Sequence, residues 1–87
     1  MARVFIPSQL QSYSGGLSLV EAPGATVEAV LRALDSRFPG IRFRVIDEQD
    51  RVRPHMRLFV GSERTLDIRD PLGESDELLI FGALSGG

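Results

Sequence analysis

The order of its hydrophobic segments predicts that this chain forms an α+β domain, in which a mixed sheet of four to five strands packs on one main helix. Apolar residues recur at helical spacing in one segment and alternate with polar residues in several others. A single helix cannot bury both faces of a sheet, so we expect it to cover one face and leave the other open. The domain is expected to occupy residues 1–82, and a flexible C-terminal Gly-Gly tail residues 83–87.

Two strands are expected before the helix. Arg3 to Ile6 is apolar and β-branched, and Pro7 ends it or makes it an edge. Gly15-Gly16 predicts a turn, after which Leu17 to Glu21 alternates until Pro23-Gly24 closes the element. The two segments are expected to pair as a β-hairpin.

The helix is the clearest element in the chain. Thr26 offers an N-cap hydroxyl, and Glu28 places a negative charge in the first turn. Pro39-Gly40 ends the helix, because the residue before a proline avoids the helical region and glycine accepts a left-handed conformation. The apolar stripe consists of Val27, Val30, Leu31, Leu34 and Phe38.

The second half of the chain predicts further strands. The segment from Ile41 to Asp50 has a mixed pattern that fits a helical turn followed by an acidic loop. Met56 to Val60 alternates and predicts a strand, and residues 65–68 are expected to form a short one. Leu78 to Phe81 is apolar and is expected to form a strand beside the first one.

Composition excludes several classes of function. The 87 residues allow one small domain with little room for an enclosed active site. The absence of cysteine excludes disulfides, thiolate metal sites and a cysteine nucleophile, and His55 is the only imidazole, to which we assign no function. No apolar run is long enough to span a membrane, and no signal peptide is evident, so a cytoplasmic protein is expected. The net charge of −2 argues against nucleic-acid binding.

The Gly-Gly end of the chain is the first candidate site. Gly86 and Gly87 have no side chains and can enter a channel too narrow for a Cβ atom, so they could reach the active site of another protein. The Gly87 carboxylate would then be the reacting group. A frayed terminus without a function explains the motif alone equally well.

The uncovered sheet face is the second candidate site. Strand alternation sends apolar side chains to this face as well as to the core. Such a patch is typical of a docking surface, although a dimer partner or a loop could also cover it. The expected partner-docking patch consists of Phe5, Phe59, Leu79 and Phe81.

A basic stretch is a weaker candidate. All ten basic residues of the chain are arginines, and five of them fall between residues 42 and 57. They could bind phosphate or an acidic partner, but the carboxylates among them favour a solvated surface. The arginines are Arg42, Arg44, Arg51, Arg53 and Arg57, and the carboxylates are Asp47, Glu48 and Asp50.

Three features of the chain resemble the small sulfur-carrier proteins of the ubiquitin-like β-grasp fold, and together they span nearly its whole length. The first is Ile6-Pro7 to Leu10 followed by Gly15-Gly16, the second is Pro71-Leu72 before Asp76-Glu77-Leu78, and the third is the terminal Leu84-Ser85-Gly86-Gly87. The family includes the small subunit of molybdopterin synthase, the sulfur carrier of thiazole biosynthesis and a carrier that serves a cysteine synthase. The Ile-Pro pattern looks most like the last of these.

The resemblance implies that the protein is a carrier and not an enzyme, although it could serve as the small subunit of a synthase. An ATP-dependent activating enzyme would adenylate Gly87, and a sulfur donor would convert the adenylate to a thiocarboxylate. A sulfur-accepting synthase would then make molybdopterin, thiamine thiazole or cysteine. Leu84 and Ser85 would set the register of the tail, with Gly86 threading behind Gly87. No bound cofactor or metal is expected, because the activating enzyme uses the ATP.

Two other functions are consistent with the sequence. The chain could be a ubiquitin-like modifier that is joined through Gly87 to lysines of target proteins, which requires the same activation. It could also be a plain interaction module whose tail has no function.

Overall fold

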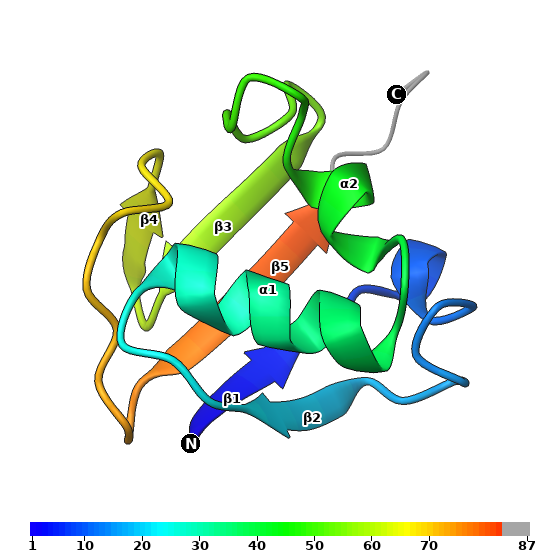
Figure 1. Ribbon diagram of the computed structural model, residues 1–87, viewed down its shortest axis with the longest axis horizontal. Coiled ribbons are helices and arrows are strands. Elements are labelled where there is room, and N and C mark those ends of the chain that lie inside the picture. Colours follow the sequence, from blue (N-terminus) through cyan, green and yellow to red (C-terminus); the bar gives the residue numbers. More distant parts are fainter. Residues whose placement is uncertain (83–87) are drawn as a thin grey trace.

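Five strands form one mixed sheet, and two α-helices lie on one of its faces (Figure 1). The computed structural model describes residues 1–82. The expected flexible tail at 83–87, with Leu84, Ser85, Gly86 and the sulfur-bearing Gly87, lies outside the described residues. The strands are β1 (Ala2–Phe5), β2 (Leu19–Ala22), β3 (Met56–Val60), β4 (Glu63–Thr65) and β5 (Glu77–Gly82); the helices are α1 (Val27–Arg37) and α2 (Ile41–Val45), and a 3₁₀ helix spans Ser8–Leu10.

The strands lie in the order β2-β1-β5-β3-β4, so β5 is the central strand. Strand β1 pairs with β2 in the antiparallel sense and with β5 in the parallel sense, and β3 pairs antiparallel with both β5 and β4. The expected hairpin and the expected contact between the first and last strands are therefore confirmed.

The core lies between the sheet and helix α1. Strand alternation places Leu78 and Ile80 of β5 on the covered face, and both are buried. Leu31 and Leu34 of α1 are buried against them as one cluster. Full burial of one such side chain contributes about 1.5–3 kcal/mol, so this layer dominates the stability of a domain of this size.

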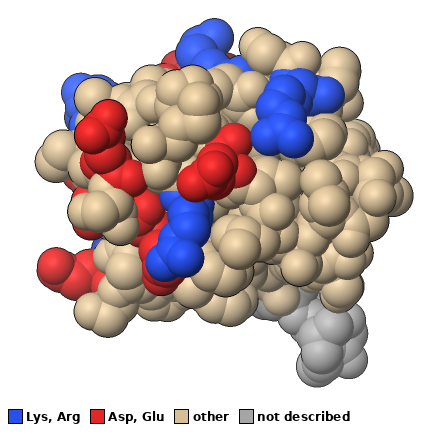
Figure 2. Space-filling model, turned by 90° about the horizontal axis from the view of Figure 1, so that it is seen from below, with Lys and Arg blue, Asp and Glu red and all other residues tan. Residues whose placement is uncertain are grey.

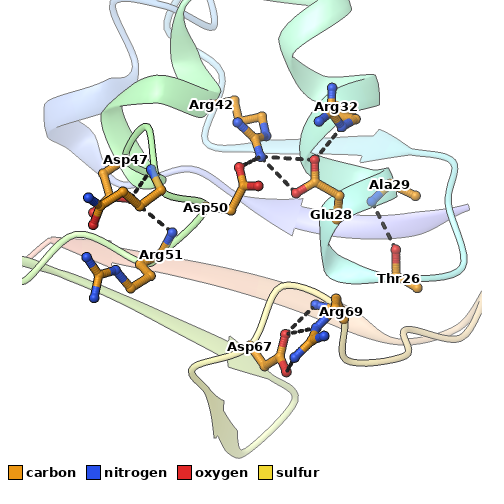
Figure 3. Close-up of polar contacts among 11 residues, drawn as sticks. Thr26, Glu28, Ala29, Arg32, Arg42, Asp47, Asp50, Arg51, Asp67 and Arg69 are labelled. Carbon is orange, nitrogen blue, oxygen red and sulfur yellow. Dashed lines mark hydrogen bonds and ion pairs between the residues drawn. The ribbon is translucent and has the colours of Figure 1, made fainter.

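Helix α1 begins as the sequence predicts. The Thr26 Oγ1 accepts a hydrogen bond from the backbone N–H of Ala29 at 3.1 Å (Figure 3). At the other end, the Asp35 carboxylate accepts from the N–H groups of Gly40 and Arg42, at 3.1 and 3.0 Å. Gly40 has a φ of 97°, which favours glycine, and the Asp35 bonds join α1 to the start of α2. The expected helical turn after Gly40 is thereby confirmed.

Thr26→Ala is expected to lower the free energy of unfolding by about 1 kcal/mol, because it leaves an N–H of the first helical turn without its acceptor. For a domain of this size the melting temperature should fall by roughly 4–8 °C. Thermal unfolding followed by circular dichroism measures this. Thr26→Ser keeps the hydroxyl and should stay close to the wild type; equal losses in both variants would contradict the capping role.

The prediction of a short strand at residues 65–68 is wrong, because β4 ends at Thr65. Residues after Thr65 turn away from the sheet to meet the start of α1, whose first N–H groups have no partner within the helix. The Ile68 carbonyl accepts from the N–H of Glu28 at 2.7 Å, and the Asp70 carbonyl accepts from that of Val27 at 3.0 Å. Neither helix within residues 1–82 is long and apolar enough to cross a membrane.

Candidate functional site

An apolar row crosses the open face of the sheet. Phe5 of β1 pairs in register with Leu19 of β2 on one side and with Leu79 of β5 on the other. Leu79 in turn pairs with Phe59 of β3, so four neighbouring strands each contribute one side chain to the row. Three of these residues belong to the expected docking patch. Leu19 was missed, although it alternates with Val20 in its own strand; its exposed fraction is 44%. Only the pairing register shows that it extends the row to the sheet edge.

Phe81, the fourth residue of the expected patch, lies two positions beyond Leu79 on β5. Its exposed fraction is 48%, and its ring meets that of Phe59 edge to face, with centroids 5.6 Å apart. Leu78 and Ile80 on either side of Leu79 are buried, so the predicted alternation of β5 is confirmed. An apolar strip therefore leads along β5 to the end of the described chain.

Charged side chains border the apolar row on the side away from the end of β5. Arg3 is the register partner of both Glu21 and Glu77, and its guanidinium pairs with the Glu77 carboxylate. Figure 2, seen from below relative to Figure 1, shows charged side chains over the left and upper parts of the view. Residues 4–20 contain no charged side chain. An apolar centre with a charged rim has the anatomy of a protein interface.

The end of β5 lies against the 3₁₀ helix. Gly82 is the register partner of Met56, and a Cβ atom at Gly82 would overlap the side-chain amide of Gln9. The Gln9 amide therefore covers the backbone where β5 ends. An open groove of about 400 Å³ adjoins this point; it is lined by Gln9, Leu10, Phe43, Arg44, Arg53, His55 and Met56. Sequence reasoning missed Gln9, and no local pattern marks it.

The basic stretch is divided by the fold. The Arg42 side chain is only 16% exposed and reaches the Glu28 carboxylate at 2.8 and 3.0 Å and Asp50 at 3.2 Å (Figure 3). The hydrogen bonds that Arg42 donates to the Glu28 carboxylate raise the pKa of Arg42 against the opposing effect of burial. Arg42 therefore joins α1, α2 and the following loop, and it is not available to a partner.

The acidic loop after α2 is a structural turn. The backbone N–H groups of Arg51 and Gln49 donate to the Asp47 carboxylate and hold the pKa of Asp47 below its ordinary value (Figure 3). His55 is exposed and lines the groove. The described part of the chain contains no cluster of His, Asp or Glu that could hold a metal ion.

Known proteins resemble the chain over its full length. No protein-family model matches it. It is 29% identical to a Mycobacterium tuberculosis protein named sulfur carrier protein CysO, with 97% of this chain and 96% of the relative covered. A chain in the crystal structure of the Amycolatopsis orientalis BexX/CysO complex matches with a TM-score of 0.92 and 30% identity, with both chains fully covered. SAMP1 from Haloferax volcanii matches with a TM-score of 0.77 and 25% identity, over 99% of this chain and 98% of SAMP1.

Proposed function

Because this chain belongs to the ubiquitin-like β-grasp family of sulfur carriers, we propose that it carries sulfur as a thiocarboxylate on Gly87. The observation that carries the proposal is the full-length likeness to proteins named as sulfur carriers, in a chain whose sequence ends in Gly-Gly. The protein is a carrier and a substrate of enzymes. The groups needed for catalysis belong to its partners.

The proposed chemistry begins with activation. A carboxylate is a poor electrophile until one of its oxygens becomes part of a good leaving group. The Gly87 carboxylate would attack the α-phosphorus of ATP in the activating enzyme and release pyrophosphate. A sulfide-level donor would then attack the acyl carbon, and AMP would leave with the carboxylate oxygen. The product is a thiocarboxylate at Gly87, whose sulfur an acceptor enzyme can take.

The described domain would supply position and recognition. Strand β5 lies between β1 and β3. The pairing with β1 extends to Leu79, and the pairing with β3 extends to Gly82, the residue before the tail, whose register partner is Met56. The apolar row and Phe81 lead to the same end of β5 and form the proposed docking patch. A partner that covers this patch would receive the tail at a defined angle. Gly86, Ser85 and Leu84 would set how far the tail enters.

The acceptor is proposed to be a cysteine synthase, because similar proteins from Mycobacterium tuberculosis and Amycolatopsis orientalis bear the name CysO. The Amycolatopsis orientalis CysO is described in a complex with BexX, which supports the proposal that this chain also works by binding partner enzymes. The partners would be the activating enzyme, a sulfur donor and the synthase. We place these reactions in the cytoplasm, a prediction from the sequence.

The intact mass of the protein tests this function. The protein is incubated with ATP, sulfide and the activating enzyme of its own host, and a sample without ATP is the control. We expect replacement of one oxygen by one sulfur, and fragmentation should place the sulfur at Gly87. An unchanged mass, with an enzyme shown to act on another carrier, would refute the proposal.

A second candidate function is that of a protein modifier, which the likeness to SAMP1, titled a small archaeal modifier protein, supports. The chain has no lysine, since all ten basic residues are arginines, so it could not form chains through its own lysine side chains. Conjugates would therefore carry it on lysines of other proteins. Host lysines that carry this chain through an isopeptide bond, detected after trypsin digestion as a branch of residues 70–87, would favour this function. Their absence beside a detected thiocarboxylate would favour the carrier.

A further inference from the structure

Three arginines surround the end of β5; we call Arg44, Arg53 and Arg57 the basic collar. Arg57 lies on β3 beside the register partner of Gly82. Arg44 and Arg53 line the open groove, and Gln9, which covers Gly82, lines it too. Figure 1 shows α2 next to the end of β5. The collar therefore stands around the base of the tail, on the side of the molecule that faces away from the Arg3–Glu77 pair.

The collar arginines are held in place without carboxylates. The Arg53 Nε donates to the Phe43 carbonyl at 2.7 Å, and its guanidinium lies 4.5 Å from the centroid of the Phe43 ring. The Arg44 guanidinium lies 5.9 Å from the Tyr13 ring. An Arg57 Nη1 donates to the backbone carbonyls of residues 54 and 56, at 2.7 and 3.0 Å. These contacts orient the side chains, and none of them involves a carboxylate.

Arginines elsewhere in the described domain form ion pairs with carboxylates, whereas the collar arginines do not. Within residues 1–82, none of the five ion pairs includes a collar arginine. Asp47 lies near enough to Arg53 for the arginine charge to help lower the pKa of Asp47, but this carboxylate is already bound by backbone N–H groups. Of the five arginines from residue 42 to residue 57, Arg42 forms ion pairs with Glu28 and Asp50 within the domain. Of the others, Arg44 and Arg53 line one groove, and Arg57 follows Met56, which lines the same groove.

We infer that the basic collar binds a carboxylate-bearing rim around the channel through which a partner enzyme receives the tail. This inference rests on the proposed function. The five residues from 83 to 87 span at most about 18 Å when fully extended, so a partner that acts on Gly87 must place its active site within that distance of the end of β5. Arginines that form no ion pair within residues 1–82 and the half-exposed Phe43 fit an acidic protein rim with an apolar contact at its edge.

A nucleic acid fits these observations less well. The chain has a net charge of −2, and Asp47, Glu48 and Asp50 occupy the loop next to the collar. Binding to a phosphate backbone needs an extended positive surface, which three clustered arginines beside an acidic loop do not provide. A compact acidic rim on a protein needs only the collar itself. Charge pairs of this kind raise the encounter rate and fix orientation, while the apolar row supplies contact area.

Charge reversal tests the inference. The variants are Arg44→Glu and Arg44→Glu/Arg53→Glu, and the matched control is Arg51→Glu, which makes the same change at an exposed arginine in the groove formed with Leu66 and Arg69. The assay is ATP-dependent adenylation by the host activating enzyme at low and high salt. We expect the double variant to raise KM about tenfold at low salt with kcat unchanged, and the control to change KM less than about twofold. The difference should shrink at about 0.5 M salt, where charges are screened.

The measured KM and kcat values separate the collar inference from the proposed function. An unchanged KM in the double variant, or a loss of kcat alone, would overturn the collar inference while the adenylated wild type upholds the proposed function. No adenylation of the wild type would overturn both. A single-stranded RNA oligonucleotide is titrated in parallel; RNA binding lost in the double variant, with KM unchanged, would assign the collar to nucleic acid instead. Should the double variant melt early, Arg44→Gln, which removes one charge and leaves Arg53 against Phe43, gives the same comparison.

Discussion

Removal of Gly86 and Gly87 is expected to abolish sulfur loading completely and to leave the melting temperature of the protein unchanged. The core and the sheet are built from residues up to Gly82, so the fold does not require the last two residues. Sulfur loading requires a carboxylate that reaches the adenylating site. The truncated chain is two residues shorter. It ends at Ser85, so the residue at the reacting position carries a side chain. Intact mass after incubation with ATP, sulfide and the activating enzyme measures the loss.

A length-matched variant separates the two causes of this loss. Replacement of Gly86-Gly87 by Ala-Ala keeps the length and the terminal carboxylate and adds one Cβ atom to each residue. If the channel of the enzyme is too narrow for a Cβ, this variant also stays unloaded. Wild-type protein mixed into the same sample shows that the enzyme is active. Sulfur found on the truncated chain would refute the role of Gly87.

Phe81→Asp is expected to raise the KM of the activating enzyme for the carrier roughly 30-fold, with the fold retained. Truncation of a central interface aromatic typically costs about 2 kcal/mol or more of binding free energy, and 1.4 kcal/mol corresponds to about a factor of ten. Phe81 is half-exposed and meets Phe59 edge to face, so loss of this pair should cost only about 0.5–1.5 kcal/mol of stability. Steady-state adenylation kinetics and thermal unfolding measure the two effects.

The control for this variant is Leu66→Asp. Leu66 is 68% exposed and lies in a different groove, beside Glu28 and Arg32 of helix α1, so it makes the same apolar-to-acidic change away from the open sheet face. Its KM should stay within about twofold of the wild type. Equal KM values for the two variants would show that the partner does not bind the docking patch formed by the apolar row and Phe81.

The apolar row and the basic collar are proposed to contribute differently to partner recognition. The apolar row, from Leu19 to Phe59, offers contact area, and the basic collar offers charge at the base of the tail. Salt should therefore affect the uncharged variant Phe81→Ala little and the collar variants strongly, since screening acts on charges and not on apolar contacts. This difference allows the two regions to be distinguished in one set of kinetic measurements.

Patterns local to the chain determined the elements of this fold. Helix α1 begins after Thr26 and β3 runs from Met56 to Val60, because caps and side-chain alternation act over only a few residues. The alternation of β5 also predicted which side chains face away from the helix, and the structure confirms it for Leu79 and Phe81. The absence of cysteine and the Gly-Gly ending are properties of the sequence alone.

Tertiary structure decided which distant residues meet. The register between β1 and β2 brings Leu19 into the apolar row, and the packing of the 3₁₀ helix places Gln9 over Gly82, which is 73 positions away. A short strand is expected at residues 65–68, yet the chain leaves the sheet after Thr65, and the carbonyls of Ile68 and Asp70 accept from the first N–H groups of α1. Arg42 and Arg44 are equivalent in sequence, but only Arg42 is buried against Glu28. Such contacts depend on the relative placement of whole elements, which no pattern within a few residues encodes.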